Sequence, residues 1–424
     1  MCWKSGAAGR SVFGAVLRRR TVLALLAVAG PGVLAGLSDD DPAGIATYSL
    51  LGAEYGYELL WVLVLSTAAL VLFHEFGARM GVVTGQGLAG LIRERYGVRK
   101  AGLAVLSLLV ANIGTTCAEF AGVAAGFELA GVSRYASVPL AAVLVSLLVL
   151  RGSFHRIEHV LLLLSSVFVA YIVSGLLADP DWSAAARGLV VPSMPASKDA
   201  VLLATATVGT TLAPWGLAFI QSYAVDKRLK PADLRFERVD VVVGAVMTGV
   251  IGFFIVVACA ATLHESGQPI DDARDAAVAL EPVAGNLAAT LFGAGIVGAA
   301  LLAASILPLS TAYSVSEALG SEAALDDSFR DAPVFYSTFG IVVATSAVLV
   351  LVPGAPLVSI MFFTQALNAV LLLPLLFFIY GIVRDRDTMG EHAVGRLGSA
   401  AALAAIGLLA ACVATLAVLS LVSP

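Results

Sequence analysis

Apolar runs long enough to cross a lipid bilayer alternate with short polar connections along almost the whole chain. A helix needs about 20 apolar residues to span the hydrocarbon core, and peptide groups inside that core must be satisfied within the span, which favours helices. Eleven such runs predict an all-α integral membrane protein with about 11 transmembrane helices. The runs lie at about 21–37 continuing to 52, 57–80, 102–130, 137–150, 160–178, 200–223, 239–263, 284–316, 334–353, 357–383 and 397–422.

The composition excludes several classes of protein. The 424 residues are 59% hydrophobic and 13% charged, whereas a soluble chain carries about 25% charged residues. Basic residues number 25 against 30 acidic ones, so we expect no nucleic-acid partner. The four cysteines form no CxxC pair, which argues against a disulfide framework or a zinc site. Because HExxH and GxSxG motifs are also absent, we expect no enzyme activity.

Lys and Arg predict the orientation, since loops rich in them stay on the cytoplasmic side. With residues 1–20 as a cytoplasmic segment and eleven spans, 21 of the 25 basic residues fall on the cytoplasmic side and 4 on the other. The prediction is a multi-pass protein of the cell membrane. Its N-terminus is cytoplasmic and its C-terminus lies on the opposite side.

Two of the runs are interrupted by Pro and Gly at membrane depth. The first contains Gly-Pro-Gly at 30–32 and Ser-Asp-Asp-Asp-Pro-Ala-Gly at 38–44, and the sixth contains Gly-Thr-Thr-Leu-Ala-Pro-Trp-Gly at 209–216. Broken helices at matching positions of two halves are typical of inverted-repeat transporters with a substrate site at the midplane. The predicted core at 21–383 then divides into two five-helix repeats, followed by an additional helix. Their ranges are 21–178, 200–383 and 397–422.

Three consecutive carboxylates, Asp39, Asp40 and Asp41, interrupt the first span. They could cap a short helix near the aqueous surface. Apolar sequence resumes at once after them, and ionisable groups at membrane depth usually serve function, which favours a cation site lined by a carboxylate and free carbonyls. Asp41 is the best candidate, because the residue before a proline is pushed out of helical geometry.

Several motifs in this chain resemble those of the Nramp divalent-metal transporters. The resemblance extends over nearly the whole chain and implies a LeuT-type fold that carries a divalent metal ion into the cytoplasm. The motifs are Gly30-Pro31-Gly32, Asp41-Pro42, Ile45-Ala46-Thr47, Gly52-Ala53, Gly56-Tyr57, Leu59-Leu60-Trp61, Gly81 to Gly85, Ala111-Asn112 to Glu119, and Met389-Gly390-Glu391.

The chain departs from the family pattern at positions that would contact the ion. Gly44 stands where the family has an Asn ligand, and Ala213 stands where it has a Met ligand. The Gln that closes on the ion is retained as Gln365, and the match between residues 216 and 220 is not fixed.

Positions linked to proton transfer in the family are altered as well. Trp215 replaces a His on the sixth helix, Thr116 replaces the Asp that partners Glu119, and His74 takes the place of a Gln on the second helix.

These changes predict a hard, partly hydrated ion. A thioether favours late transition metals, and Ala213 removes it. Mg²⁺ sheds water reluctantly and is held by few carboxylates, which suits a wide site made of Asp41 and carbonyls such as those of Ser38 and Thr210. The pattern resembles the Nramp-related magnesium transporter branch. We therefore expect Mg²⁺ as the transported ion, with Mn²⁺ also accepted and no permanently bound cofactor.

Loss of titratable groups predicts transport without proton coupling. Neither Trp215 nor Thr116 can titrate, which leaves Glu119 and His74. Glu119 could serve a relay or be a helix contact, and His74 could belong to a polar cluster at the cytoplasmic end of its helix. The membrane potential alone favours entry of a dication by about 4.6 kcal/mol at 100 mV.

Two alternatives stay open. One is a proton-coupled Mn²⁺/Fe²⁺ transporter that tolerates these substitutions. A more remote one is an amino-acid symporter of the same fold, although the Asp triplet would repel a substrate carboxylate. The lipid bilayer is an expected partner, and the oligomeric state stays open, with a monomer as one option.

Overall fold

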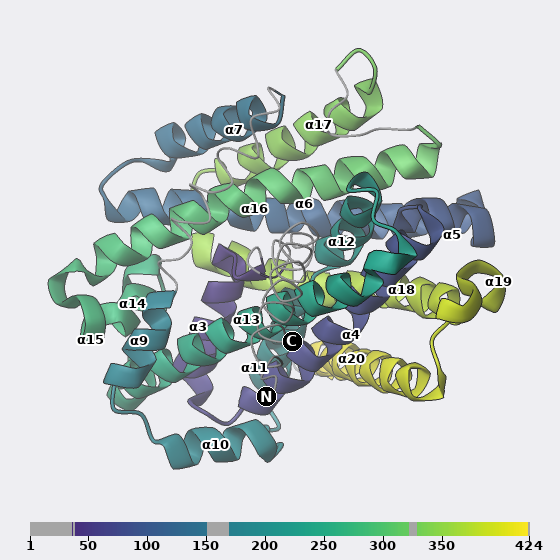
Figure 1. Cartoon of the computed structure of the whole chain (residues 1–424). Coiled ribbons are helices and arrows are strands. Elements are labelled where there is room, and N and C mark those ends of the chain that lie inside the picture. The colour runs from purple at the N-terminus through teal and green to yellow at the C-terminus, as the bar shows by residue number, and fades with distance from the viewer. Residues whose placement is uncertain (1–35, 37–38, 151–168, 322–328, 423–424) are drawn as a thin grey trace, which may run out of the picture.

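The protein is represented by a computed structural model, which describes residues 36, 39–150, 169–321 and 329–422 (Figure 1). Within these ranges all regular secondary structure is helical, so the predicted all-α class is confirmed. The helices are α3 (Pro42–Tyr55), α4 (Leu60–Thr84), α5 (Leu88–Tyr96), α6 (Val98–Leu129), α7 (Arg134–Leu150), α9 (Val169–Leu177), α10 (Trp182–Val190), α11 (Lys198–Thr211), α12 (Pro214–Asp226), α13 (Leu234–Cys259), α14 (Ala273–Ala277), α15 (Glu281–Ala284), α16 (Ala288–Leu319), α17 (Pro333–Val350), α18 (Leu357–Val383), α19 (Arg386–Met389) and α20 (Arg396–Val422).

These helices follow the apolar runs of the sequence closely. Among the described residues, 8 helical stretches are long and apolar enough to cross a membrane, and they correspond to eight of the predicted runs. A ninth run, predicted at 137–150, is the 17-residue helix α7. The first and fifth runs lie only partly within the described residues, as α3 and α9.

The helices differ sharply in how far they are enclosed by the rest of the protein. In the stretch formed by α11 and α12, 94% of the most apolar window is buried, against 17% in α20. The broken sixth span therefore lies in the centre, and α20 packs from outside against α11 and α18. On another side α6 runs along α16 and α18, with α7 and α17 beside it (Figure 1).

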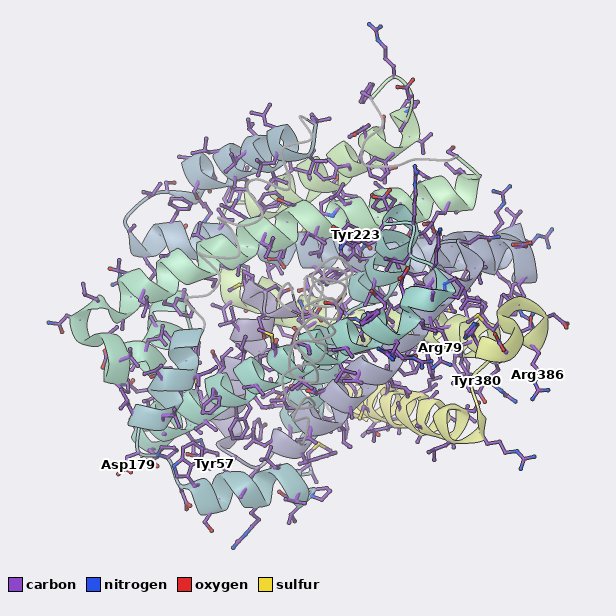
Figure 2. The ribbon with its side chains drawn as sticks, in the orientation of Figure 1. Tyr57, Arg79, Asp179, Tyr223, Tyr380 and Arg386 are labelled. Carbon is purple, nitrogen blue, oxygen red and sulfur yellow. The ribbon has the colours of Figure 1, made fainter. Side chains whose placement is uncertain are left out.

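The two ends of the bundle carry different side chains. Arg79, Tyr380 and Arg386 gather at one end, and Tyr57 and Asp179 lie at the other (Figure 2). The end with Arg79, Tyr380 and Arg386, which also carries α5 and α19, is called the basic end. It is the end that the distribution of Lys and Arg predicts to be cytoplasmic.

Candidate metal site

The break before α3 holds a carboxylate in the interior. Asp41 is the N-cap of the helix, with φ −77° and ψ 170°, and Pro42 is its first residue. Proline needs no hydrogen-bond acceptor there, and it forces its predecessor into this extended conformation. The Asp41 Oδ1 accepts a hydrogen bond of 2.6 Å from Gly44 N. Because only 4% of Asp41 is exposed, this cap lies in the core and not at the aqueous surface.

The second break separates α11 from α12. Helix α11 ends at Thr211, and Leu212 turns the chain with φ −110° and ψ 65°. Ala213 is the N-cap of α12, with φ −72° and ψ 139°, and Pro214 opens that helix. Since Ala213 contributes only a methyl group, no soft ligand is present at this break.

The two breaks bring three oxygen atoms together around Gly44. A Cβ atom on Gly44 would lie 2.8 Å from the Asp39 carbonyl oxygen, 3.3 Å from Asp41 Oδ1 and 3.4 Å from Thr210 Oγ1. Among the described residues, Thr210 Oγ1 has no hydrogen-bond partner although it is buried. Thr210 thus presents its hydroxyl here, and Ser38, the other predicted carbonyl donor, lies outside the described residues.

Glu119 of α6 faces the same place. Helix α6 touches α3 where a Cβ on Gly122 would lie 2.5 Å from the Pro42 ring, and Glu119 lies one turn earlier. Its carboxyl group interacts with that of Asp41. Within the described part of the chain no donor meets the two buried Glu119 oxygens. Two carboxylates in contact repel each other unless a cation or a proton lies between them.

The remaining predicted positions on α6 and α12 are occupied by groups with structural contacts. The Thr116 hydroxyl donates to Asn112 O of its own helix at 2.7 Å. Trp215 is buried, its ring lies 6.2 Å from that of Phe219, and its carbonyl accepts a hydrogen bond from Ser310.

Gln365 belongs to a hydrogen-bonded chain between helices. Its Oε1 accepts from Asn368 Nδ2 at 2.9 Å, and the same amide donates to Thr115 Oγ1 at 2.9 Å. Asn368 and Thr115 are linking residues that the sequence did not single out. A contact between Gln365 and the ion stays a prediction.

The structure corrects the grouping of His74 with its charged neighbours. Glu75 pairs with Arg79 at 2.6 Å and with Arg238 of α13 at 2.7 Å. His74 lies on another face of α4 and is 1% exposed. The polar cluster expected at this end of the helix therefore forms without His74, because consecutive residues of a helix point in different directions.

The basic end is closed by hydrogen bonds that could not be predicted from the sequence. Glu317 of α16 accepts hydrogen bonds from Ser222 Oγ at 2.7 Å and from Ala89 N at 3.2 Å. Gln221 Nε2 donates to the Gln86 carbonyl at 2.9 Å. Glu317 thus lies in the last turn of the long apolar helix α16 and holds the first turn of α5.

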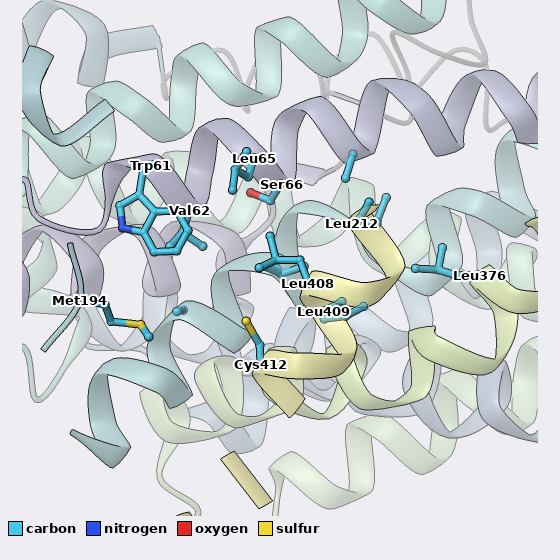
Figure 3. Close-up of a pocket in the computed structure, with 14 residues that line it drawn as sticks. Trp61, Val62, Leu65, Ser66, Met194, Leu212, Leu376, Leu408, Leu409 and Cys412 are labelled. Atoms are coloured by element: carbon cyan, nitrogen blue, oxygen red, sulfur yellow. The ribbon is translucent and has the colours of Figure 1, made fainter. Parts of the chain in front are cut away.

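A cavity of about 50 Å³ elsewhere in the bundle lacks the chemistry of an ion site (Figure 3). It lies between α4, α11, α18 and α20, and Ser66 is its one hydroxyl-bearing lining residue. The Ser66 hydroxyl bonds to Leu63 O and Thr211. In the described ranges, no group of three or more His, Cys, Asp or Glu residues converges as a metal-ligand set. Any ion bound at the two breaks must therefore also use hydroxyl, carbonyl or water oxygens.

Comparison with known proteins finds similarity over most of the chain. The model of the family described as Nramp: Natural resistance-associated macrophage protein-like matches residues 32–420. A divalent metal cation transporter MntH of Pectobacterium carotovorum is 35% identical over 284 residues, which cover 65% of this chain and 68% of the relative. A transporter of that name from Burkholderia ambifaria is 33% identical over 286 residues, covering 65% and 64%. The matched part spans about two thirds of these relatives.

Solved structures share the fold. A manganese transporter of Eremococcus coleocola, in complex with an aromatic bis-isothiourea substituted compound, has a TM-score of 0.77 at 19% identity. The match covers 97% of this chain and 87% of that one. MhsT in complex with L-phenylalanine has a TM-score of 0.61 at 13% identity, covering 92% and 97%. These similarities confirm the predicted LeuT-type fold.

Proposed function

This chain belongs to the Nramp family, and on that premise we propose that it transports divalent metal ions, preferring Mg²⁺ and also accepting Mn²⁺. The names of its MntH relatives, divalent metal cation transporters, support the class of substrate. Transport runs by alternating access into the cytoplasm, through a core whose repeats are 21–178 and 200–383. Facing breaks in the first and sixth spans support this division.

The observation that carries the proposal is the meeting of three oxygens at the two helix breaks. Asp41 supplies the negative charge, and the Asp39 carbonyl and the Thr210 hydroxyl supply neutral oxygens beside it. The Glu119 carboxyl adds a second acidic group in contact with Asp41. A divalent cation relieves the repulsion between these carboxylates and completes the coordination of the unpartnered hydroxyl.

The type of ligand favours a hard ion. The oxygens gathered around Gly44 are carboxylate, carbonyl and hydroxyl, the ligands that Mg²⁺ and Mn²⁺ prefer. Gly44 and Ala213 supply no ligand side chain. A Cβ on Gly44 would lie 2.8 Å from the Asp39 carbonyl oxygen, so the three oxygens pack closely around this glycine. We propose Gly44, Ala213, Gln365 and Ser38 as lining residues beside Asp41 and Thr210.

Uptake into liposomes tests this function. Purified protein should give saturable Mg²⁺ entry. Loss of a buried charged partner costs about 3–5 kcal/mol, so Asp41→Ala should reduce entry by more than about 100-fold. Asp199→Ala, an exposed carboxylate in the first turn of α11, serves as the control and should transport normally. Mn²⁺ entry without Mg²⁺ entry would overturn the proposed preference for Mg²⁺. If Asp41→Ala and the wild type gave equal Mg²⁺ entry, Asp41 would not bind the transported ion.

One contact favours the competing function, a proton-coupled Mn²⁺/Fe²⁺ transporter. The Asp41 and Glu119 carboxyl groups lie together in the core, and such a pair can exchange a proton for a metal ion. We propose uncoupled transport, because Trp215 and Thr116 cannot pass a proton onward. A pH-sensitive dye inside the liposomes should stay unchanged during Mg²⁺ entry. Acidification in step with metal entry, abolished by Glu119→Gln, would establish the coupled mechanism.

A further inference from the structure

A second pair of buried polar side chains meets beside α12, next to the oxygens around Gly44, where Asp39 contributes its carbonyl. A Cβ on Gly216 would lie 3.1 Å from His74 Nε2 and 3.7 Å from Asp39 Oδ1. The two atoms are therefore separated by less than the sum of these distances. Asp39 and His74 are each 1% exposed, and among the described residues their side-chain oxygens and nitrogens have no hydrogen-bond partner.

Close packing fixes the imidazole at this point. His74, Gly77 and Gly81 follow one another on the face of α4 that meets α12. A Cβ on Gly77 would lie 2.9 Å from Ile220 Cγ2, and one on Gly81 would lie 2.6 Å from Gln221 O. The two backbones therefore touch, and His74 stays between them next to Gly216.

The pair lies on the side of Asp41 that leads to the basic end. Asp39 precedes Asp41 in the chain, and Gly216 follows Pro214, the residue that opens α12. From there α4 and α12 both run toward the hydrogen bonds of Gln221 with Gln86. The pair therefore lies between Asp41 and the basic end.

We propose that Asp39 and His74 form a second cation position, which holds the metal ion after it leaves Asp41 and favours Mn²⁺ over Mg²⁺. This rests on the proposed transport function. Opposite ligands of a small divalent ion lie about 4–5 Å apart, so one ion bridges the two groups directly or through one water. Mn²⁺ accepts the imidazole nitrogen, whereas Mg²⁺ keeps oxygen ligands and its water.

The discriminating measurement is pulsed electron paramagnetic resonance of Mn²⁺ bound to the intact protein. The wild type should show ¹⁴N coupling from a directly bound imidazole, and His74→Gln should lose it. His264→Gln is the matched control, because His264 Nδ1 lies 2.9 Å from Ala53 O, remote from the basic end. Gly216→Ala keeps both ligands but fills the space between them, and it should weaken the coupling. Absence of nitrogen coupling in the wild type, or its persistence in His74→Gln, overturns the proposal.

Transport separates a ligand from a merely structural residue. Loss of one ligand or its support lowers metal affinity about 10–100-fold. In liposomes His74→Gln should reduce Mn²⁺ uptake at least about tenfold and Mg²⁺ uptake by a clearly smaller factor, whereas Asp39→Asn should reduce both equally. Parallel loss of both metals in His74→Gln would mean a packing role. If the wild type transports neither metal into liposomes but Mn²⁺ bound to it shows the nitrogen coupling, the proposed transport function is wrong and the second cation position is retained.

Discussion

The centre of the protein and its basic end differ in how their buried polar side chains are hydrogen-bonded. In the centre, Thr210, His74 and Asp39 hold side-chain polar atoms that find no partner among the described residues. At the basic end, Glu317 accepts hydrogen bonds from Ser222 and from the backbone of α5, and the Gln221 amide nitrogen donates to the Gln86 carbonyl. Gln221 Oε1 has no partner among the described residues.

This difference distinguishes the centre, where an ion would bind, from the basic end, where hydrogen bonds hold the helices closed. A buried polar atom without a partner costs about 1–3 kcal/mol, and native proteins keep few of them. Such atoms in the centre fit a site that a passing ion completes. The paired groups at the basic end instead stabilise one arrangement of α5, α12 and α16. They can exchange these partners for water when the helices separate.

The largest effect on stability should come from removing Glu317. Glu317→Ala deletes a carboxylate that accepts hydrogen bonds from Ser222 and from Ala89 at the start of α5. Hydrogen bonds to a charged group contribute about 1.5–3 kcal/mol each, so we expect the free energy of unfolding in detergent to fall by about 3–6 kcal/mol. Glu94→Ala, on the exposed side of α5, should leave the melting temperature unchanged. Equal melting temperatures of the two variants would show that Glu317 does not stabilise the closed basic end.

Two adjacent threonines offer the most direct test of the comparison. The Thr211 hydroxyl contacts Tyr48 at 2.9 Å and Ser66 at 3.2 Å and donates to Thr207 O at 2.8 Å, whereas Thr210 Oγ1 has no described partner. Thr211→Val should cost about 1–2 kcal/mol of stability. Thr210→Val should keep the wild-type melting temperature and reduce Mg²⁺ uptake about tenfold, as loss of one ligand does. Reversed results for the two variants would contradict the distinction.

The smallest effect concerns the junction between α18 and α19 at the basic end. The hydrogen bond from the Thr388 hydroxyl and the nearby Arg95 guanidinium hold the pKa of Asp385 below its ordinary value. A lowered pKa stabilises the folded state above the unfolded value of about 3.9, and that contribution is lost as pH falls through the folded value. Asp385→Asn should therefore melt slightly below the wild type at pH 7 and together with it near pH 3. Asp387 is exposed, so Asp387→Asn should have the wild-type melting temperature at both pH 7 and pH 3.

The fold could be predicted from the sequence because the bilayer imposes one requirement on every span. Apolar length located the helices to within a few residues, as with α18, which begins and ends where the run at 357–383 does. Pro and Gly located the break at Ala213, since proline cannot continue a helix. The resemblance to a known family then supplied the arrangement of the spans in space.

The site was predictable only where its chemistry is local. Asp41 before Pro42 determines its own geometry, and the structure places it in the core as expected. The approach of Asp39 and His74 to Gly216 depends on how α4 and the residues before α3 pack against α12, which no local pattern encodes. The same holds for Gln365, whose oxygen is engaged by Asn368. Contacts between distant helices require tertiary packing before they can be seen.

The close contact between α4 and α12 bears on how motion in this protein can be observed. Gly77 and Gly81 let the two backbones touch, so the helices must tilt as one piece or lose that contact altogether. A pair of spectroscopic labels placed on α4 and α12 distinguishes the two cases, because their separation stays constant through the transport cycle only when the helices tilt as one piece. Labels on α12 and α5 instead lie across the hydrogen bond between Gln221 and Gln86, and they would register each opening of the basic end.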